Sequence, residues 1–337
     1  MSKILSEDAS QLVYHADTFK SGARILVTGA SGLIGINLLA LFLSDEFVKK
    51  SIDVYVCVNS EASKTFLKTT FPNSRIHFIS VDLVGFKTFS LDQSFDYIFH
   101  LATYGQPGKF MSEQQDTMRL NSIGLIKLFQ YLQPTGRLFF ASTSEVYSGN
   151  PNTPHVESEI GNTTTTHPRA CYIEAKRFGE TFCYLKSQAG VNAYSGRISL
   201  AYGPGFRVGD RRVLNEFIFN ALRTGSIQMM DDGSALRVYC YVRDTVDMIL
   251  RQIHSNYFEP LNIGGVEQIS IIDLANKVAN NCAAKVFPGK PAEHVGGAPL
   301  IVSSSTILAS KILDKKSYVP MDEGIARATK WGQFILK

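Results

Sequence analysis

An α/β fold with a doubly wound, mostly parallel sheet is predicted by two features of the sequence. Short apolar runs alternate with amphipathic helical segments from residue 24 to residue 200, which is the pattern of repeated βαβ units. The first apolar run, 24–29, ends in a glycine-rich turn that opens an apolar helix. Beyond residue 203 the alternation is less regular, which predicts a smaller lobe interleaved with the last strands of the sheet.

The composition sets limits on class and partners. The chain has 337 residues, 45% of them hydrophobic, which is enough for one large domain or two lobes. Its net charge is +4 and the basic residues are spread out, so no nucleic-acid partner is expected. The five cysteines lie apart without zinc-site spacing, which predicts no metal, reduced thiols and a cytoplasmic location. The longest apolar run is too short to cross a membrane, and no signal peptide is seen.

Residues 1–22 precede the first strand and are predicted to be an N-terminal extension. A short helix is expected over 6–16, and Gly22 would end the segment. The sequence is compatible with packing on the body and with fraying. We place the dinucleotide-binding domain at 23–202 and the substrate-binding lobe at 203–337.

The turn after the first strand reads TGASGLIG, in which three glycines form GxxGxxG. Glycines allow the backbone to approach a pyrophosphate, whose charge then sits at the amino end of the following helix. Gly35 also lets that helix lie close to the sheet. The turn predicts the cofactor site of a Rossmann-type fold, formed by Gly29, Ser31, Gly32, Leu33, Ile34 and Gly35.

The second strand, expected at 52–58, bears on which dinucleotide is bound. Folds that prefer NAD usually end this strand with an acidic residue for the ribose hydroxyls. Here the strand is followed by Asn59 and Ser60, with Lys64 nearby. NAD is the expected cofactor, and NADP remains open.

The third and fourth strands, expected at 75–80 and 96–102, complete the cofactor site at their carboxyl ends. Asp82 and Leu83 follow the third strand, where an Asp either meets the adenine or caps a helix. The fourth strand ends where a cofactor would cross the edge of the sheet. We assign Leu101 and Ala102 to that crossing.

A strand at 137–141 and a helix over 172–188 carry the residues expected to do chemistry. Tyr172 and Lys176, in the spacing YxxxK, lie one helical turn apart on the same face. The lysine ammonium is expected to lower the pKa of the phenol, which could then take a proton from a hydroxyl while hydride leaves for a nicotinamide. Thr143 and Glu145 follow the strand and are expected to act on the same substrate.

The remaining elements are predicted from apolar periodicity alone. A long amphipathic helix over 117–132 should carry Asn121, and a sixth strand is expected at 192–200 before a Gly/Pro turn. A polar connection with Pro288, Pro291 and Pro299 follows later. Further helices are expected over 212–224, 244–254, 271–281, 305–313 and 322–336, and further strands over 227–230, 237–241 and 261–263.

Three motifs, TGASGLIG, STSEVY and YIEAK, stand in the order and spacing of the extended short-chain dehydrogenase/reductases (the NAD-dependent epimerase/dehydratase family) that modify nucleotide sugars. The chain resembles that family from about residue 24 to residue 334. Within it, PRACYIEAKR, DDGSALRVYCYVRD and NIGG are most similar to the UDP-glucuronate decarboxylase (UDP-xylose synthase) branch. The resemblance implies a Rossmann-type fold, bound NAD, a nucleotide-sugar substrate and a role in polysaccharide biosynthesis.

The resemblance also implies roles for individual residues. Tyr172 would take the proton of the sugar C4 hydroxyl, and Lys176 would bind the nicotinamide ribose, so that both also contact the cofactor. Thr143 would hold the C4 oxygen, and Glu145 would lie over the sugar. Asn121 would steady the site. Substrate contacts are implied for Ser144, Arg212 and Arg237.

The resemblance further implies a homodimer. Relatives pair two helices of each subunit into a four-helix bundle, and here those helices would be the ones over 117–132 and 172–188. Their outward faces carry Leu125, Phe129, Phe182 and Leu185, which could form that interface or belong to the core.

Two departures keep other reactions open. Leu200 stands where decarboxylases carry Asn, so a 4-epimerase or a 4-ketoreductase remains an alternative. Ser144 replaces the Asp of many 4,6-dehydratases, although one dehydratase branch has the same Thr-Ser-Glu order. A dinucleotide-binding module without catalysis is disfavoured because Tyr172 and Lys176 are both present.

Overall fold

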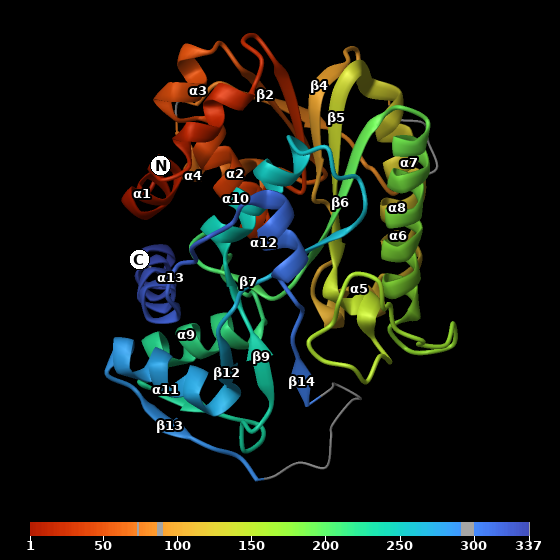
Figure 1. Ribbon diagram of the computed structural model, residues 1–337. Coiled ribbons are helices and arrows are strands. Elements are labelled where there is room, and N and C mark those ends of the chain that lie inside the picture. The colour runs from red at the N-terminus through yellow and green to blue at the C-terminus, as the bar shows by residue number, and fades with distance from the viewer. Residues whose placement is uncertain (73, 86–89, 291–299, 337) are drawn as a thin grey trace.

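A seven-stranded parallel sheet forms the centre of the molecule (Figure 1). The computed structural model describes residues 1–72, 74–85, 90–290 and 300–336. The strand order is β11-β6-β5-β4-β1-β2-β3, with every neighbouring pair parallel. The predicted doubly wound parallel sheet is confirmed. The strands are β1 (Arg24–Thr28), β2 (Asp53–Val58), β3 (Ile76–Ser80), β4 (Phe95–His100), β5 (Leu132–Thr143), β6 (Asn192–Ile198) and β11 (Leu261–Ile263).

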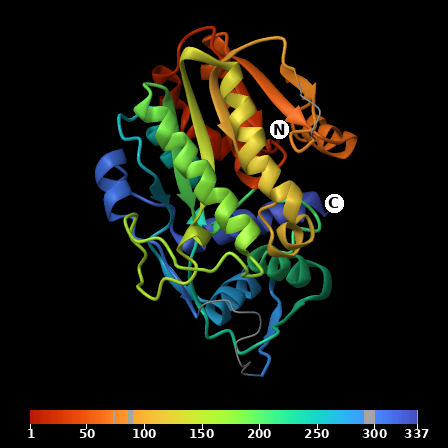
Figure 2. The same ribbon diagram turned by 90° about the vertical axis from the view of Figure 1, so that its right-hand side faces the viewer.

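Helices cover both faces of this sheet. The helical run from α6 (Gln114–Arg119) to α7 (Leu125–Leu128) lies beside α8 (Ala170–Gln188) on one face (Figure 2). The other face is covered by α2 (Leu33–Phe42) and α10 (Val242–Ile253). Because side chains alternate along a strand, successive residues of β1 enter different cores: Ile25 and Val27 pack on the α2 side, and Leu26 packs on the α8 side.

The helix predicted over 117–132 is interrupted. A π-helical segment, Leu120–Gly124, separates α6 from α7, and a 3₁₀ turn at Phe129–Tyr131 leads directly into β5. Asn121 is fully buried within the π-helical segment and donates to the Thr117 carbonyl at 2.7 Å. Single π-helical turns widen a helix locally, which aims side chains that a regular helix would not.

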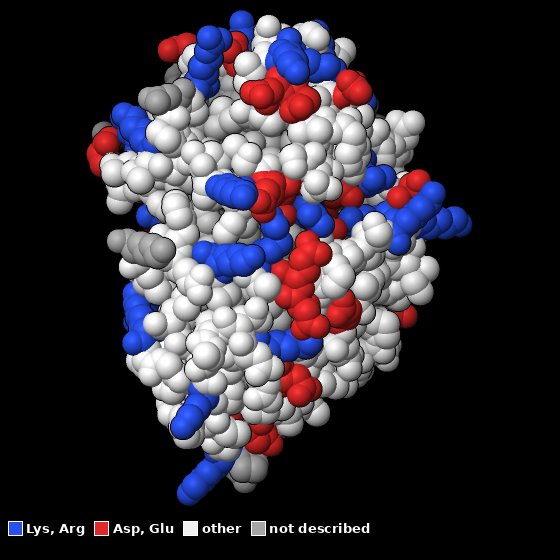
Figure 3. Space-filling view, turned by 90° about the vertical axis from the view of Figure 1, so that its left-hand side faces the viewer, with Lys and Arg blue, Asp and Glu red and all other residues white. Residues whose placement is uncertain are grey.

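The N-terminal segment packs on the body instead of fraying. Its helix α1 (Lys3–Ser10) begins earlier than the predicted 6–16 because Ser2 caps it by accepting from Leu5 N–H at 3.4 Å. A 3₁₀ helix, Val13–Thr18, follows. The α1 helix packs against α2. Figure 3 shows one face of the molecule, on which positively and negatively charged side chains are mixed in a band across the middle.

Two clusters of buried charges hold this segment in place. Asp8, 2% exposed, accepts from the Tyr241 hydroxyl at 2.6 Å and pairs with Arg327 and Arg243. The second cluster surrounds Asp247, whose carboxylate meets Tyr14, His15, Arg251 and Lys315. These partners hold the pKa of Asp247 far below its usual range, against the cost of burial.

The C-terminal part of the chain forms the lower lobe in Figure 1. Its helices α9 (Val213–Thr224), α11 (Ile271–Cys282) and α13 (Met321–Ile335) pack on one another. Trp331 on α13 is buried and donates to the Phe206 carbonyl at 2.8 Å. The chain also returns to the main sheet through β11, which pairs with β6.

One predicted strand beyond residue 203 was wrong. The strand expected at 237–241 is two strands, β9 (Leu236–Val238) and β10 (Cys240–Tyr241). They pair with different partners, because β9 lies between β12 (Gln268–Ser270) and β14 (Ile301–Val302), whereas β10 pairs with β7 (Ala201–Tyr202). Pro291 and Pro299 of the predicted polar connection lie outside the described residues. No helix in the described part of the chain is long and apolar enough to cross a membrane.

Candidate functional site

The glycine-rich turn leaves room for a dinucleotide at the carboxyl end of β1. Gly29 has φ +69°, and a Cβ there would lie 2.6 Å from the Ala102 amide nitrogen. A Cβ on Gly35 would lie 2.5 Å from the Ala30 Cα, so the helix needs glycine to approach the turn. Gly32 begins α2 without a side-chain cap within the described chain, which leaves N–H groups of the first turn free to face a pyrophosphate. The glycine-rich turn and the start of α2 therefore fit the pyrophosphate of NAD.

Replacing Gly29 by alanine should damage both the fold and NAD binding. Alanine would be strained at this φ and would collide with the 101–102 backbone, so we expect a loss of at least about 3 kcal/mol in the free energy of unfolding. Gly22 is a matched control, because it has φ +71° but a Cβ there would have no described atom within 4 Å. Gly22→Ala should cost about 1–2 kcal/mol. Thermal unfolding and NAD titration measure both; equal losses would contradict the proposed close approach.

The other predicted cofactor residues lie at the ends of neighbouring strands. Asn59 is exposed after β2, and Ser31 Oγ lies 3.5 Å from Ser63 Oγ beside it. Asp82 accepts from the Val84 N–H at 3.0 Å, which is a local turn, so its carboxylate already has one partner. The remaining three residues lie at the same end of the sheet. Leu83 is buried, and the backbone N–H groups of Leu101 and Ala102 donate to the carbonyl and the hydroxyl of Thr28.

The predicted catalytic residues come together where β5 ends beside α8. Lys176 is 1% exposed, donates to the Ala141 carbonyl at 2.6 Å, and has its Nζ 5.7 Å from the centre of the Tyr172 ring. Tyr172 is 6% exposed, and its hydroxyl interacts with that of Thr143. The Thr143 oxygen in turn accepts from the Glu145 N–H at 3.2 Å. One threonine therefore links the tyrosine and the glutamate.

The expected lowering of the tyrosine pKa was wrong. Burial raises the pKa of Tyr172 to about 12, although a hydrogen bond from Thr143 opposes the rise. Burial also lowers the pKa of Lys176 to about 7, with the carboxylate of Glu180 opposing that change. Both shifts have the same cause, since a dry interior disfavours the charged form of either group.

Glu145 lies among cationic groups. Its Oε1 is 2.6 Å from Arg169 Nη2, and the charges of His167 and Arg237 also act on it. Burial nevertheless raises the pKa of Glu145, and Arg169 provides the largest opposing effect. The site thus places one carboxylate, that of Glu145, among two arginines and one histidine, directly beside Tyr172.

A model of the NAD dependent epimerase/dehydratase family matches residues 25–264. The chain belongs to this family. A UDP-glucuronic acid decarboxylase 1 of Danio rerio is 30% identical, with 93% of this chain and 73% of the relative covered. A UDP-glucuronic acid decarboxylase 6 of Arabidopsis thaliana is 33% identical, with 77% and 74% covered.

Solved structures of two epimerases have the same fold. An epimerase from Methanothermobacter thermautotrophicus superposes with a TM-score of 0.79 at 21% identity, covering 96% of each chain. A UDP-glucuronic acid 4-epimerase from Bacillus cereus, in complex with UDP-glucuronic acid and NAD, has a TM-score of 0.75 at 21% identity, covering 93% of this chain and 99% of that one. The prediction of an NAD-dependent enzyme of this family is confirmed.

The predicted substrate contacts are only partly brought together in this family member. Arg237 on β9 faces Glu145, and its Nη1 donates to the Leu300 carbonyl at 3.0 Å. Ser144 is half-buried at the start of a 3₁₀ turn next to Thr143. Arg212, at the amino end of α9, is paired with Asp210 and is not part of the Glu145 cluster. Leu200 accepts from Cys240 N–H through its backbone at 3.1 Å.

Sequence reasoning missed three residues of the site. Arg169 precedes Tyr172 by three positions, so its place at the same end of α8 was a usable signal. Glu180 follows Lys176 by four positions and lies on the same helix face. Phe110 on α5 (Pro107–Ser112) had no such signal, yet its ring stacks on that of Tyr172 with centres 4.5 Å apart and planes 3° apart.

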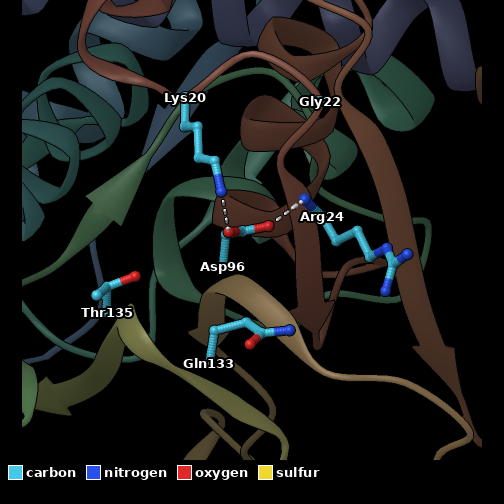
Figure 4. A pocket seen from close by; sticks show the side chains of 6 residues that line it. All are labelled: Lys20, Gly22, Arg24, Asp96, Gln133 and Thr135. Atoms are coloured by element: carbon cyan, nitrogen blue, oxygen red, sulfur yellow. Dashed lines mark hydrogen bonds and ion pairs between the residues drawn. The ribbon is translucent and has the colours of Figure 1, made fainter.

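A polar hollow of about 310 Å³ lies at the end of the sheet opposite the candidate site (Figure 4). Its lining comes from the amino ends of strands, where Asp96 accepts from Arg24 N–H at 2.9 Å and pairs with Lys20 at 3.5 Å. Ligands of such sheets bind at the carboxyl ends, so this hollow is not the candidate site. Among the described residues, no group of three or more His, Cys, Asp or Glu side chains is placed to hold a metal ion.

Proposed function

We propose that this enzyme is a UDP-glucuronate decarboxylase that oxidises the sugar at C4 with bound NAD. It is a nucleotide-sugar enzyme, as its curated relatives are, and the cationic surroundings of Glu145 carry the choice of an acid sugar. Arg169, Arg237 and His167 surround that single carboxylate. A site with this excess of positive groups favours a substrate that brings a second carboxylate. With a neutral hexose, Glu145 would remain the single carboxylate among these groups.

The residues have the following roles in this proposal. Tyr172 takes the proton of the C4 hydroxyl, and Thr143 donates to the C4 oxygen that becomes a ketone. When bound, NAD would supply a positive charge that lowers the pKa of a neighbouring phenol, and it would provide a reversible acceptor for the C4 hydride. Lys176 binds the nicotinamide ribose. The 4-ketone turns the C5 carboxylate into a β-keto acid, which loses CO2.

The test is incubation with UDP-glucuronate and NAD, followed by mass spectrometry of the nucleotide sugars. Loss of the mass of CO2 is the expected result. Unchanged mass with a shifted retention time would replace decarboxylation by 4-epimerisation, which the same cationic site would also serve. No change with UDP-glucuronate, but turnover of neutral nucleotide hexoses or of 4-keto sugars with NADPH, would overturn the acid-sugar proposal in favour of a neutral-sugar epimerase, dehydratase or reductase.

We also propose a homodimer that forms through the helices on the α8 face and works in the cytoplasm. Leu125, predicted for this interface, is fully buried in the core, and Phe129 and Phe182 are half-buried. Leu185, also predicted for this interface, is exposed, and it belongs to a set of exposed apolar side chains on the two adjacent helical runs that supports the proposal. They are Met118, Ile123, Ile126, Phe178 and Leu185. Five free cysteine thiols accord with a reducing compartment.

Leu185→Asp should convert the dimer to a monomer. Leu185 is 60% exposed on α8, and a carboxylate in an apolar helix interface would be buried without a partner. Light scattering at micromolar concentration measures the change. Ile307, 80% exposed on α12 (Ile307–Leu313), is the control, and Ile307→Asp should leave the dimer intact. A monomeric wild-type protein would refute the proposal.

A further inference from the structure

The ion pair between Glu145 and Arg169 lies beside Tyr172, the residue proposed to meet the sugar. It is a single contact, Nη2 to Oε1 at 2.6 Å, and the two side chains are 29% and 19% exposed. Arg169 Nε is buried without a hydrogen-bond partner among the described residues. Because 19% of the Arg169 side chain is exposed, a ligand can reach part of the guanidinium, and a guanidinium can hold a carboxylate through two parallel bonds.

Arg169 is held independently of Glu145. It stands at the amino end of α8, where its backbone carbonyl accepts from the Tyr172 N–H at 3.1 Å. Its guanidinium lies 5.5 Å from the centre of the Phe110 ring, which is itself 1% exposed and stacked on Tyr172. The position of the arginine should therefore persist when the glutamate turns away.

We propose that the substrate carboxylate displaces Glu145 from Arg169, and that Glu145 takes up a proton on release and later gives it to C5. This inference rests on the proposed acid-sugar substrate and goes beyond it, because it assigns a carboxylate-binding residue and a proton donor. The groups that face Glu145 are Arg169, His167, Arg237 and Tyr172.

The electrostatics favour this exchange. Burial is the main cause that raises the pKa of Glu145, and Arg169 is the strongest influence against it. When a substrate carboxylate takes Arg169 as its partner, Glu145 loses the cation that lowers its pKa, and a second negative charge comes to lie nearby. Both changes raise the pKa of Glu145 further, so protonation should accompany binding.

The proton balance of the reaction closes with this donor. When the C5–C6 bond breaks, CO2 leaves and its electron pair forms the enolate of the 4-ketone. The enolate then takes the Glu145 proton at C5, which restores the ketone and leaves a carboxylate. Departure of CO2 has by then freed Arg169, so the regenerated carboxylate regains its partner.

Isothermal calorimetry of the NAD-loaded Tyr172→Phe protein tests the exchange, because that background binds substrate without turnover. Titration with UDP-glucuronate in buffers of different ionisation enthalpy should show net proton uptake, and titration with UDP-glucose should show none. Glu145→Gln should abolish the uptake while UDP-glucuronate still binds. Equal uptake with both sugars, or uptake that survives Glu145→Gln, would overturn the inference.

Arg169→Met should weaken UDP-glucuronate binding about 10–100-fold and leave UDP-glucose binding within about twofold, because only the acid sugar uses the guanidinium. Arg169→Lys keeps the charge and should recover part of the loss, which guards against misfolding as the cause. Equal weakening of both sugars by Arg169→Met and by Arg169→Lys would overturn the exchange while leaving the proposed function standing. Absence of UDP-glucuronate binding to the Tyr172→Phe protein, with UDP-glucose still bound, would overturn both.

Discussion

Replacing Tyr172 by phenylalanine is expected to lower turnover by about 10²–10⁴-fold, the usual contribution of a positioned acid–base group. The hydroxyl is the group that can exchange a proton with the C4 oxygen, and it already meets the Thr143 hydroxyl. The ring itself should stay in place, because it is 6% exposed and stacked on Phe110. Mass spectrometry of the product measures turnover, and NAD titration checks that the cofactor still binds.

Tyr184 provides a matched control on the same helix. It lies on α8 like Tyr172 but is 40% exposed and distant from the β5 end. Tyr184→Phe should leave turnover unchanged within about twofold, since surface changes away from a site rarely matter. If Tyr172→Phe kept wild-type turnover, a group other than Tyr172 would have to exchange the C4 proton.

The largest loss of stability is expected from Arg197→Met, about 3–5 kcal/mol in the free energy of unfolding. Arg197 on β6 is 4% exposed and binds Glu180 through Nε at 3.0 Å and Nη2 at 2.8 Å. Its Nη1 also donates to the Tyr147 hydroxyl at 2.9 Å. Removal of the guanidinium would leave the carboxylate of Glu180 buried without its cation.

An exposed ion pair on the surface gives the comparison. Lys277 and Asp322 also form a contact, but their side chains are 36% and 77% exposed. Lys277→Met should therefore cost under about 1 kcal/mol. Chemical denaturation measures both variants. A loss for Arg197→Met as small as that for Lys277→Met would show that water reaches Glu180 in the folded protein.

The fold was predictable because its strongest signals are local in the sequence. Buried parallel strands read as short apolar runs, and the turn at Gly29–Gly35 joins one to a helix. The π-helical turn around Asn121 and the break between β9 and β10 were not predictable, because each depends on contacts with distant segments. Apolar periodicity cannot report such contacts.

In the candidate site, too, the features with local sequence signals were predictable, and those that depend on distant contacts were not. Tyr172 and Lys176 were predicted from their spacing and Thr143 from its place at the end of a strand, and the structure brings the three together. Their protonation was not predictable, because it depends on how completely the surrounding chain excludes water. The pairing of Glu145 with Arg169 joins a 3₁₀ turn to the amino end of α8 across 24 positions, so no local pattern indicated it.

The contacts of the N-terminal segment constrain the order in which the protein folds during its synthesis. Asp8 leaves the ribosome early, but its partners Tyr241 and Arg327 follow 233 and 319 positions later. At about 5–20 residues per second, that interval is tens of seconds. Until then the Asp8 carboxylate on α1 has no site in which it can be buried and paired, so the helix can dock only after the segment that carries Arg327 has been made. The α1 helix therefore docks long after it has been synthesised.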